Sequence, residues 1–122
     1  MRILYVEDNA ELRETIGMLM EGEGRVVTSC ASAEEALELE SRQAFDVLVS
    51  DVSLPGISGT DLARKVLERD PLRWVVLCSG YDLQGYPASW GPHVRTLLKP
   101  FDLEELEELL GSIQDAVGRP VA

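Results

Sequence analysis

The sequence predicts an α/β protein in which a parallel β-sheet is covered by helices on both faces. Short apolar runs alternate along its 122 residues with segments in which apolar residues recur every three or four positions. The run Val47–Ser50 is apolar on both faces, as in a strand at the centre of such a sheet. Helix-capping signals, such as Ser32 with Glu35, stand between the runs. Strands that alternate with helices form βαβ units, and these units place the strands parallel.

The first part of the chain predicts two strands and a helix. Ile3–Val6 is a continuous apolar run and is predicted as a buried strand. A helix is predicted at Asn9–Glu21, and Gly22 and Gly24 end it. Arg25–Cys30 partly alternates apolar and polar residues, which favours a strand at the edge of the sheet. The residues expected on the inward face of this helix are Leu12, Ile16, Leu19 and Met20.

The middle of the chain predicts two helices around the central strand. The capping box Ser32–Glu35 opens the second helix. After the central strand, Leu54-Pro55-Gly56 turns the chain. Ser58 with Asp61 caps the third helix, and Asp70-Pro71 ends it. The apolar residues expected to face inward are Ala36, Leu37, Leu39, Leu62, Val66 and Leu67.

The last part of the chain predicts two strands and one long helix. The strands are Trp74–Cys78 and Val94–Leu98. Between them, Tyr81–Pro92 contains so many glycines and prolines that we expect at most a short or distorted fourth helix. Asp102 with Glu105 caps the last helix. Its expected inward face consists of Leu103, Leu106, Leu110, Ile113 and Val117.

These elements leave few possible topologies, because crossovers between parallel strands are right-handed. We predict a flavodoxin-like (βα)5 three-layer sandwich with the parallel sheet order 2-1-3-4-5. That order places the first and third strands side by side, at the point where the strand order reverses. No repeat or linker interrupts the pattern, so residues 1–122 are predicted to form a single domain with a short tail at 118–122.

Composition narrows the functional classes. The formal net charge of −11 argues against nucleic acid or an anionic membrane surface as a direct partner, because both require a basic face. No apolar run has the length of a transmembrane helix, and no signal peptide opens the chain. Cys30 and Cys78 lie in predicted strands that are too far apart for a disulfide. They therefore favour reduced thiols and a cytoplasmic location.

Polar residues follow four of the predicted strands. Glu7 and Asp8 follow the first, Asp51 the third, Ser79 the fourth and Lys99 the fifth. In a parallel sheet these ends meet at one edge, and open α/β sheets bind their ligands at that edge. Clustered carboxylates are typical ligands of Mg²⁺, with Mn²⁺ as the alternative.

Each strand end then has a role in phosphoryl chemistry. Asp51 would be the nucleophile and would form an acyl phosphate. Lys99 would pair with one phosphate oxygen, and Ser79 would donate its hydroxyl to another. A metal ion held by Asp8 and Asp51 would neutralise charge during the transfer. Taken singly, these side chains could equally be a loop acid, a turn serine and a surface lysine; their common register favours a site.

The ordered set of motifs resembles the receiver domain of the bacterial two-component response-regulator family (CheY-like). The matching pieces, which span essentially the whole chain, are Val6-Glu7-Asp8-Asn9, Asp51 with Leu54-Pro55-Gly56 and Gly59, Ser79-Gly80 and Lys99-Pro100-Phe101. The resemblance implies that Asp51 accepts a phosphoryl group from a phosphohistidine, on a sensor histidine kinase or a histidine phosphotransfer protein. It implies a signalling switch with weak self-catalysed phosphotransfer and autodephosphorylation, rather than a metabolic enzyme.

The resemblance also implies a ligand set for the metal. Asp8, Asp51 and the backbone carbonyl of Ser53 would hold the ion, and Glu7 would act mainly through a water molecule. The Lys99–Pro100 peptide bond is expected to be cis. Ser53 and Tyr81 would tune the lifetime of the phosphoryl group, or they are ordinary loop residues.

One position departs from the family pattern. Thr96 stands three residues before Lys99, where the family usually has Tyr or Phe. The alternatives are therefore a pseudo-receiver that binds partners without phosphate, and the receiver module of a hybrid histidine kinase. A Mg²⁺-dependent phosphohydrolase is disfavoured, because the sequence offers neither a second acid/base nor a substrate cap. The start of the chain, Met1-Arg2, favours a stand-alone receiver that acts on an unknown downstream protein.

Overall fold

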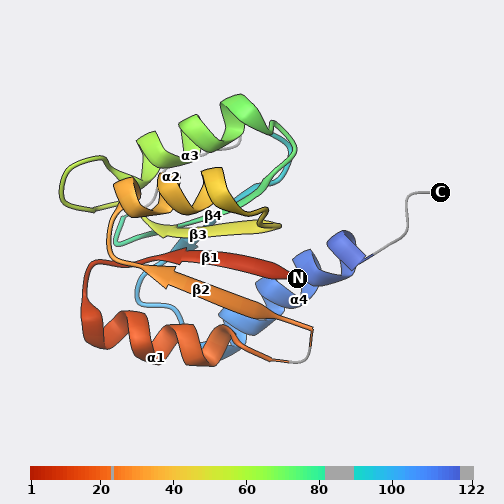
Figure 1. The fold of residues 1–122 in the computed structure, drawn as a ribbon. Helices are drawn as coiled ribbons and strands as arrows, with labels where there is room; N and C mark the ends of the chain where they lie inside the picture. The colour runs from red at the N-terminus through yellow and green to blue at the C-terminus, as the bar shows by residue number, and fades with distance from the viewer. Residues whose placement is uncertain (23, 82–89, 119–122) are drawn as a thin grey trace.

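The computed structural model describes residues 1–22, 24–81 and 90–118, and it has the predicted fold (Figure 1). Five parallel strands form one sheet in the order β2-β1-β3-β4-β5. The strands are β1 (Arg2–Val6), β2 (Val26–Cys30), β3 (Val47–Asp51), β4 (Trp74–Ser79) and β5 (Val94–Leu98). The predicted strands are confirmed, with differences of one residue at some of their ends.

Four helices are present in the described part of the chain: α1 (Ala10–Met20), α2 (Ala33–Arg42), α3 (Gly59–Arg69) and α4 (Leu103–Gly118). Each begins at a side-chain cap, because the first backbone N–H groups of a helix lack partners within it. The capping side chains are those of Asn9, Ser32, Ser58 and Asp102. The expected short or distorted fourth helix falls mainly on residues 82–89, and most of the tail on 119–122. Both lie outside the described residues.

The two faces of the sheet bury separate apolar clusters. Figure 1 shows α2 and α3 over one face and α1 and α4 over the other. The α2/α3 side packs residues such as Leu48, Leu62 and Leu77, whereas the α1/α4 side packs residues such as Val49 and Leu110. All five residues of β3 are buried, as predicted for the central strand. Asp51 therefore ends a rigid, fully covered element.

Three predicted inward-facing residues are largely exposed. Leu12 and Leu19 of α1 are 44% and 41% exposed, because this helix turns Gly17 toward the core together with Met20, which is buried as predicted. Gly17 lets the helix approach β2 closely: a Cβ at this position would lie 3.4 Å from the Ser29 hydroxyl. Leu103, which is 50% exposed, belongs to the first turn of α4, ahead of the buried positions that begin at Leu106.

The cysteines lie as predicted: Cys30 and Cys78 are buried free thiols. None of the helices in the described ranges has both the length and the apolar character needed to cross a membrane.

Candidate functional site

The predicted polar residues meet at the carboxyl edge of the sheet. Glu7 and Asp8 directly follow β1, Asp51 ends β3 and Ser79 ends β4, while Lys99 directly follows β5. Because β1 pairs with β3, with Val6 opposite Ser50, the acids that follow these strands become neighbours.

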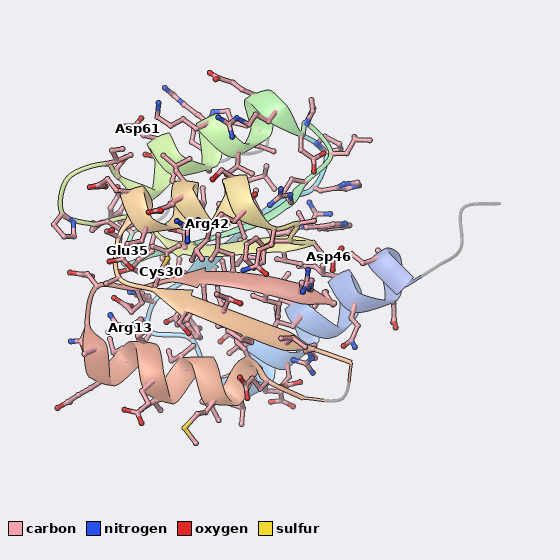
Figure 2. All side chains as sticks on the ribbon, in the orientation of Figure 1. Arg13, Cys30, Glu35, Arg42, Asp46 and Asp61 are labelled. Carbon is pink, nitrogen blue, oxygen red and sulfur yellow. The ribbon has the colours of Figure 1, made fainter. Side chains whose placement is uncertain are left out.

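Position along the strand decides which acids join this site. Asp46, directly before β3, accepts a hydrogen bond from the Arg2 N–H at 2.7 Å. It therefore lies at the opposite edge of the sheet, away from Glu35 and Asp61 (Figure 2). Asp46, which precedes its strand, therefore takes no part in the group of acids that follow or end the strands.

Three carboxylates form a compact group. Each of Glu7, Asp8 and Asp51 offers one oxygen, and these oxygens all lie within 4.8 Å of one another. Glu7 is 3% exposed, and its carboxylate accepts a hydrogen bond from the Asn9 N–H at 3.2 Å. Burial, and then the charge of Asp51, raises the pKa of Glu7 in spite of that hydrogen bond. The ionised form of Glu7 would therefore be stabilised by positive charge nearby.

Lys99 supplies part of that charge. Its ammonium forms an ion pair with the Asp51 carboxylate and lies 3.8 Å from a Glu7 oxygen. Partial burial lowers the pKa of Lys99, but the hydrogen bond and charge of Asp51 outweigh this effect, and the pKa is raised. The Lys99 N–H donates to the Ser79 carbonyl at 2.6 Å, and the Lys99–Pro100 peptide bond is cis, as expected.

The donor set fits a divalent cation. One ammonium against three carboxylates leaves a net charge of −2 when all are ionised. Carboxylates packed this closely are stable as anions only when a cation neutralises them. Hard oxygen donors with one exposed member, Asp8, match the preference of Mg²⁺ for carboxylates and retained water.

The Ser79 hydroxyl forms its hydrogen bonds with the backbone of Tyr81 rather than with the carboxylates. Its hydroxyl donates to the Tyr81 carbonyl at 2.7 Å and accepts from the Tyr81 N–H at 3.1 Å. A serine bonded to the backbone two residues later is a common turn. That turn was one of the two interpretations left open for Ser79, and it describes this conformation. The hydroxyl must leave Tyr81 before it can donate to a ligand near Asp51.

The backbone of Asp51 is held by contacts that its sequence motif alone did not reveal. The Ser50 hydroxyl donates to the Asp51 carbonyl at 2.9 Å. Gly59, at the start of α3, lies so close that a Cβ there would be 1.8 Å from the same carbonyl oxygen. Its N–H donates to the Val52 carbonyl at 2.9 Å. The position of Gly59 in the motif was visible in the sequence, but the close approach that requires a glycine was not.

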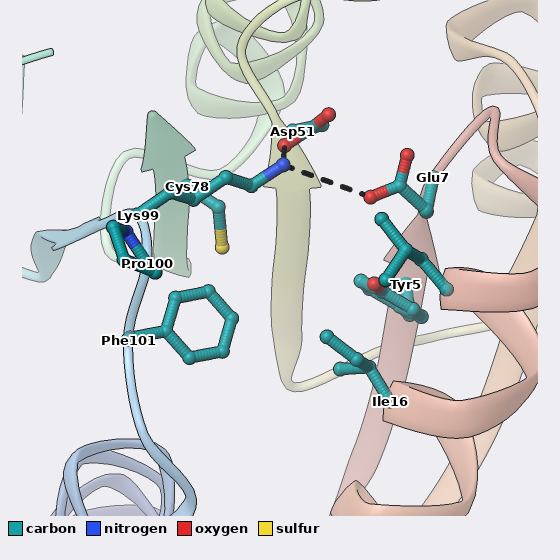
Figure 3. A pocket seen from close by; sticks show the side chains of 9 residues that line it. Tyr5, Glu7, Ile16, Asp51, Cys78, Lys99, Pro100 and Phe101 are labelled. Carbon is teal, nitrogen blue, oxygen red and sulfur yellow. Dashed lines mark ion pairs between the residues drawn. The ribbon is translucent and has the colours of Figure 1, made fainter. Parts of the chain in front are cut away.

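Two hollows adjoin the carboxylates. An open hollow of about 580 Å³ is lined by residues that include Asp8, Ser53 and Tyr81. A second hollow, of about 440 Å³, lies on the other side of Asp51 and Lys99, toward α1 (Figure 3). The open hollow brings exposed Ser53 near Asp8, so Asp8 can be reached from solvent on this side.

The fold and the site define a receiver domain, and the comparison with known families agrees. The model of the response regulator receiver domain matches residues 3–111, so the chain belongs to this family. Receiver domains are signalling switches of two-component systems rather than classical enzymes.

Individual relatives give the same result. The chain is 33% identical over 118 residues to the two-component response regulator PhoP of Pseudomonas aeruginosa, covering 93% of this chain but only 51% of that protein. The response regulator TrrA of Thermotoga maritima, solved in complex with Mg(2+)-BeF, is 26% identical with a TM-score of 0.78 (92% of this chain, 97% of that one). The receiver domain of the hybrid histidine kinase CckA is 32% identical with a TM-score of 0.77 (93% and 98%).

Proposed function

We propose that this chain is a phosphoacceptor whose Asp51 takes a phosphoryl group from a phosphohistidine. The observation that carries the proposal is the contact of Asp51 with Lys99 inside the group of three carboxylates. An ordinary solvated loop acid would not be expected to lie beside a buried glutamate. Nor would it be expected to form an ion pair with a lysine that follows β5, two strands away in the sheet. Asp51 is 9% exposed and ends the central strand, so its carboxylate is held in place for reaction.

The transfer follows from these side chains. An oxygen of the Asp51 carboxylate attacks the phosphorus, the new P–O bond forms, and the bond from phosphorus to the imidazole nitrogen breaks. The electron pair of that bond stays on the imidazole. Lys99 can shift from the carboxylate to a phosphoryl oxygen without leaving the site. Ser79 would donate its hydroxyl to another phosphoryl oxygen once it leaves Tyr81.

A divalent cation belongs to the proposal as well. Asp8, Asp51 and the backbone carbonyl of Ser53 would hold Mg²⁺, or Mn²⁺ in its place, and Glu7 would act mainly through a water molecule. When bound, the ion would supply positive charge to the transferring phosphoryl group. Asp8 and Ser53 both line the open hollow, so the proposed ligands lie on the side from which a donor approaches.

The partners would be a sensor histidine kinase or a histidine phosphotransfer protein, and a downstream protein. The chain spans about half the length of PhoP, and the proposed partners are those of the receiver domain itself. The similarity to the CckA receiver keeps a hybrid kinase among the possible contexts. Other relatives, such as TcrX of Mycobacterium tuberculosis, are named as probable transcriptional regulatory proteins, so the prediction against nucleic acid concerns this chain alone.

Intact-mass measurement after incubation with acetyl phosphate and Mg²⁺ tests the proposal. We expect one phosphoryl adduct that needs Mg²⁺, disappears in Asp51→Asn and persists in Asp115→Asn. Asp115 is an exposed acid on α4 and serves as the matched control.

An adduct that is unchanged in Asp51→Asn would overturn the assignment of Asp51. No adduct with acetyl phosphate or with phosphoramidate would favour the pseudo-receiver. Circular dichroism of the variants separates loss of the acceptor from loss of the fold.

A further inference from the structure

The cavity beneath Asp51 has a volume of about 440 Å³, which is in the range of small-molecule sites. It lies on the face of the sheet that α1 covers, and Figure 3 shows Asp51, Lys99 and Glu7 at one end of it. The proposed phosphoryl chemistry uses only this charged end. The rest of the lining is not needed for it.

Two buried polar side chains point into this cavity. Tyr5 is 4% exposed and Cys78 is 5% exposed. Figure 3 shows the Tyr5 hydroxyl and the Cys78 sulfur directed toward the space that the lining side chains enclose. Within residues 1–22, 24–81 and 90–118, neither group has a hydrogen-bond partner. The Tyr5 hydroxyl is not among the fully buried unpaired atoms of the described residues; it faces open space and is free to donate to a ligand there.

The remaining lining is mostly apolar and favours a ligand with an apolar framework. Ile16, Pro100 and Phe101 supply apolar surface, and Leu12, 44% exposed, lies at the outer side. A ring in this space could pack against Phe101 with the offset or edge-on geometry that aromatic pairs prefer. Water that enters this space meets mostly apolar lining, so a ligand that covers the lining displaces it favourably.

The charged end argues against an anionic ligand. Glu7 and Asp51 outnumber Lys99, whose ammonium is already paired with Asp51. A carboxylate or phosphate in the cavity would therefore meet net negative charge. An uncharged ligand meets no such penalty.

From this geometry we propose that the cavity binds a small uncharged aromatic molecule carrying a hydrogen-bond acceptor, which receives the Tyr5 hydroxyl. Binding needs no phosphoryl transfer, although the occupant would lie directly against Asp51 and Lys99. Binding is measured without a phosphoryl donor, so its failure is distinguishable from failure of the proposed function.

Two probes of nearly equal shape test the site: acetophenone, which has a carbonyl acceptor, and ethylbenzene, which has none. Each is titrated into ¹⁵N-labelled protein, and the amide signals of Tyr5, Ile16, Cys78 and Phe101 are followed. We expect saturable shifts at these positions and a Kd for acetophenone roughly fivefold to tenfold lower than for ethylbenzene, the usual worth of one hydrogen bond. In Tyr5→Phe the two Kd values should become equal.

A matched pair of variants locates the binding. Ile16→Trp fills the cavity from α1 and should abolish the shifts from both probes. Met18→Trp, on the same helix but 68% exposed and outside the lining, should leave them unchanged. Absence of saturable shifts in the wild-type protein, equal Kd values for the two probes, or shifts that survive Ile16→Trp would each overturn the proposal.

Discussion

The ammonium of Lys99 forms an ion pair with the carboxylate of Asp51, although β4 separates the strands that carry them. Asp51 ends β3, and Lys99 follows β5 at the same edge of the sheet. The long lysine side chain reaches past β4 to the acid. The pair therefore places a cation at the proposed phosphoacceptor, Asp51, in the protein without ligand.

Lys99→Met should raise the affinity for Mg²⁺ severalfold and lower the rate at which the phosphoryl adduct forms. The substitution removes a positive charge that competes with the metal for Asp51, and with it the group available to a phosphoryl oxygen. Isothermal titration calorimetry measures the first effect and intact mass the second. Lys65→Met, at an exposed lysine of α3, should change neither quantity. Equal Mg²⁺ affinity in wild-type and Lys99→Met protein would show that the ion pair does not oppose the metal.

Glu7→Gln should stabilise the metal-free protein at neutral pH. Burial and then the charge of Asp51 raise the pKa of Glu7 above its ordinary value of 4.5. Between that value and the raised one, the folded protein binds more protons than the unfolded chain, so the free energy of unfolding falls as the pH rises. Glutamine does not ionise, so it avoids this fall in the free energy of unfolding. Its amide oxygen can still accept the hydrogen bond from the Asn9 N–H.

Urea denaturation in EDTA at about pH 4 and about pH 7 measures this effect. The advantage of Glu7→Gln should be larger at the higher pH and should shrink when Mg²⁺ is added. Glu14→Gln, at an exposed acid on α1, is the control. A variant that is less stable than wild type at neutral pH would contradict the assigned sign.

Gly59→Ala and Gly111→Ala should change stability in opposite directions. An alanine Cβ at position 59 would lie 1.8 Å from the Asp51 carbonyl oxygen, so the backbone must move, at a cost of roughly 1–3 kcal/mol or more. Gly111 lies within α4, and a Cβ there would meet no atom within 4 Å, so alanine should add about 0.4–1 kcal/mol. Thermal denaturation of both variants checks the signs. Equal effects would mean that the close approach of Gly59 has no energetic consequence.

The Arg73–Glu40 ion pair should contribute far more than the Arg42–Glu38 pair. The side chains of Arg73 and Glu40 are 10% and 8% exposed and join through two contacts of 2.5 and 2.8 Å. Removing one partner leaves a buried charge, which costs about 3–5 kcal/mol. Arg42 and Glu38 are 70% and 62% exposed, and such pairs contribute about 0–1 kcal/mol.

Chemical denaturation of Arg73→Met and Arg42→Met compares the two pairs. The double variant Arg73→Met/Glu40→Leu should recover much of the loss, because it leaves no unpaired buried charge; Asp70, the other partner of Arg73, is 50% exposed. Similar losses in the two single variants would contradict the difference in burial.

Local signals account for the parts of the fold that were predicted correctly. The capping side chains of Ser32, Ser58 and Asp102 each accept a hydrogen bond from the N–H three residues later. Both partners of each bond therefore lie within four consecutive residues, and the cap can be predicted from the local sequence. The order of the strands followed from the handedness of crossovers and from the burial expected of the third strand. The inward positions of α1 failed at Leu12 and Leu19, because the rotation of a helix on a sheet depends on packing that its own period does not specify.

The sequence by itself determined which residues would reach the carboxyl edge of the sheet, since all residues that directly follow parallel strands lie at that edge. It thereby grouped Glu7, Asp8, Asp51, Ser79 and Lys99 at one edge. Only the tertiary structure decided which of these side chains touch. Lys99 pairs with Asp51, whereas Ser79 forms hydrogen bonds with Tyr81, and a cavity opens beside Asp51. These outcomes depend on side-chain conformation and on packing between distant segments, and neither follows from the order of residues along one strand.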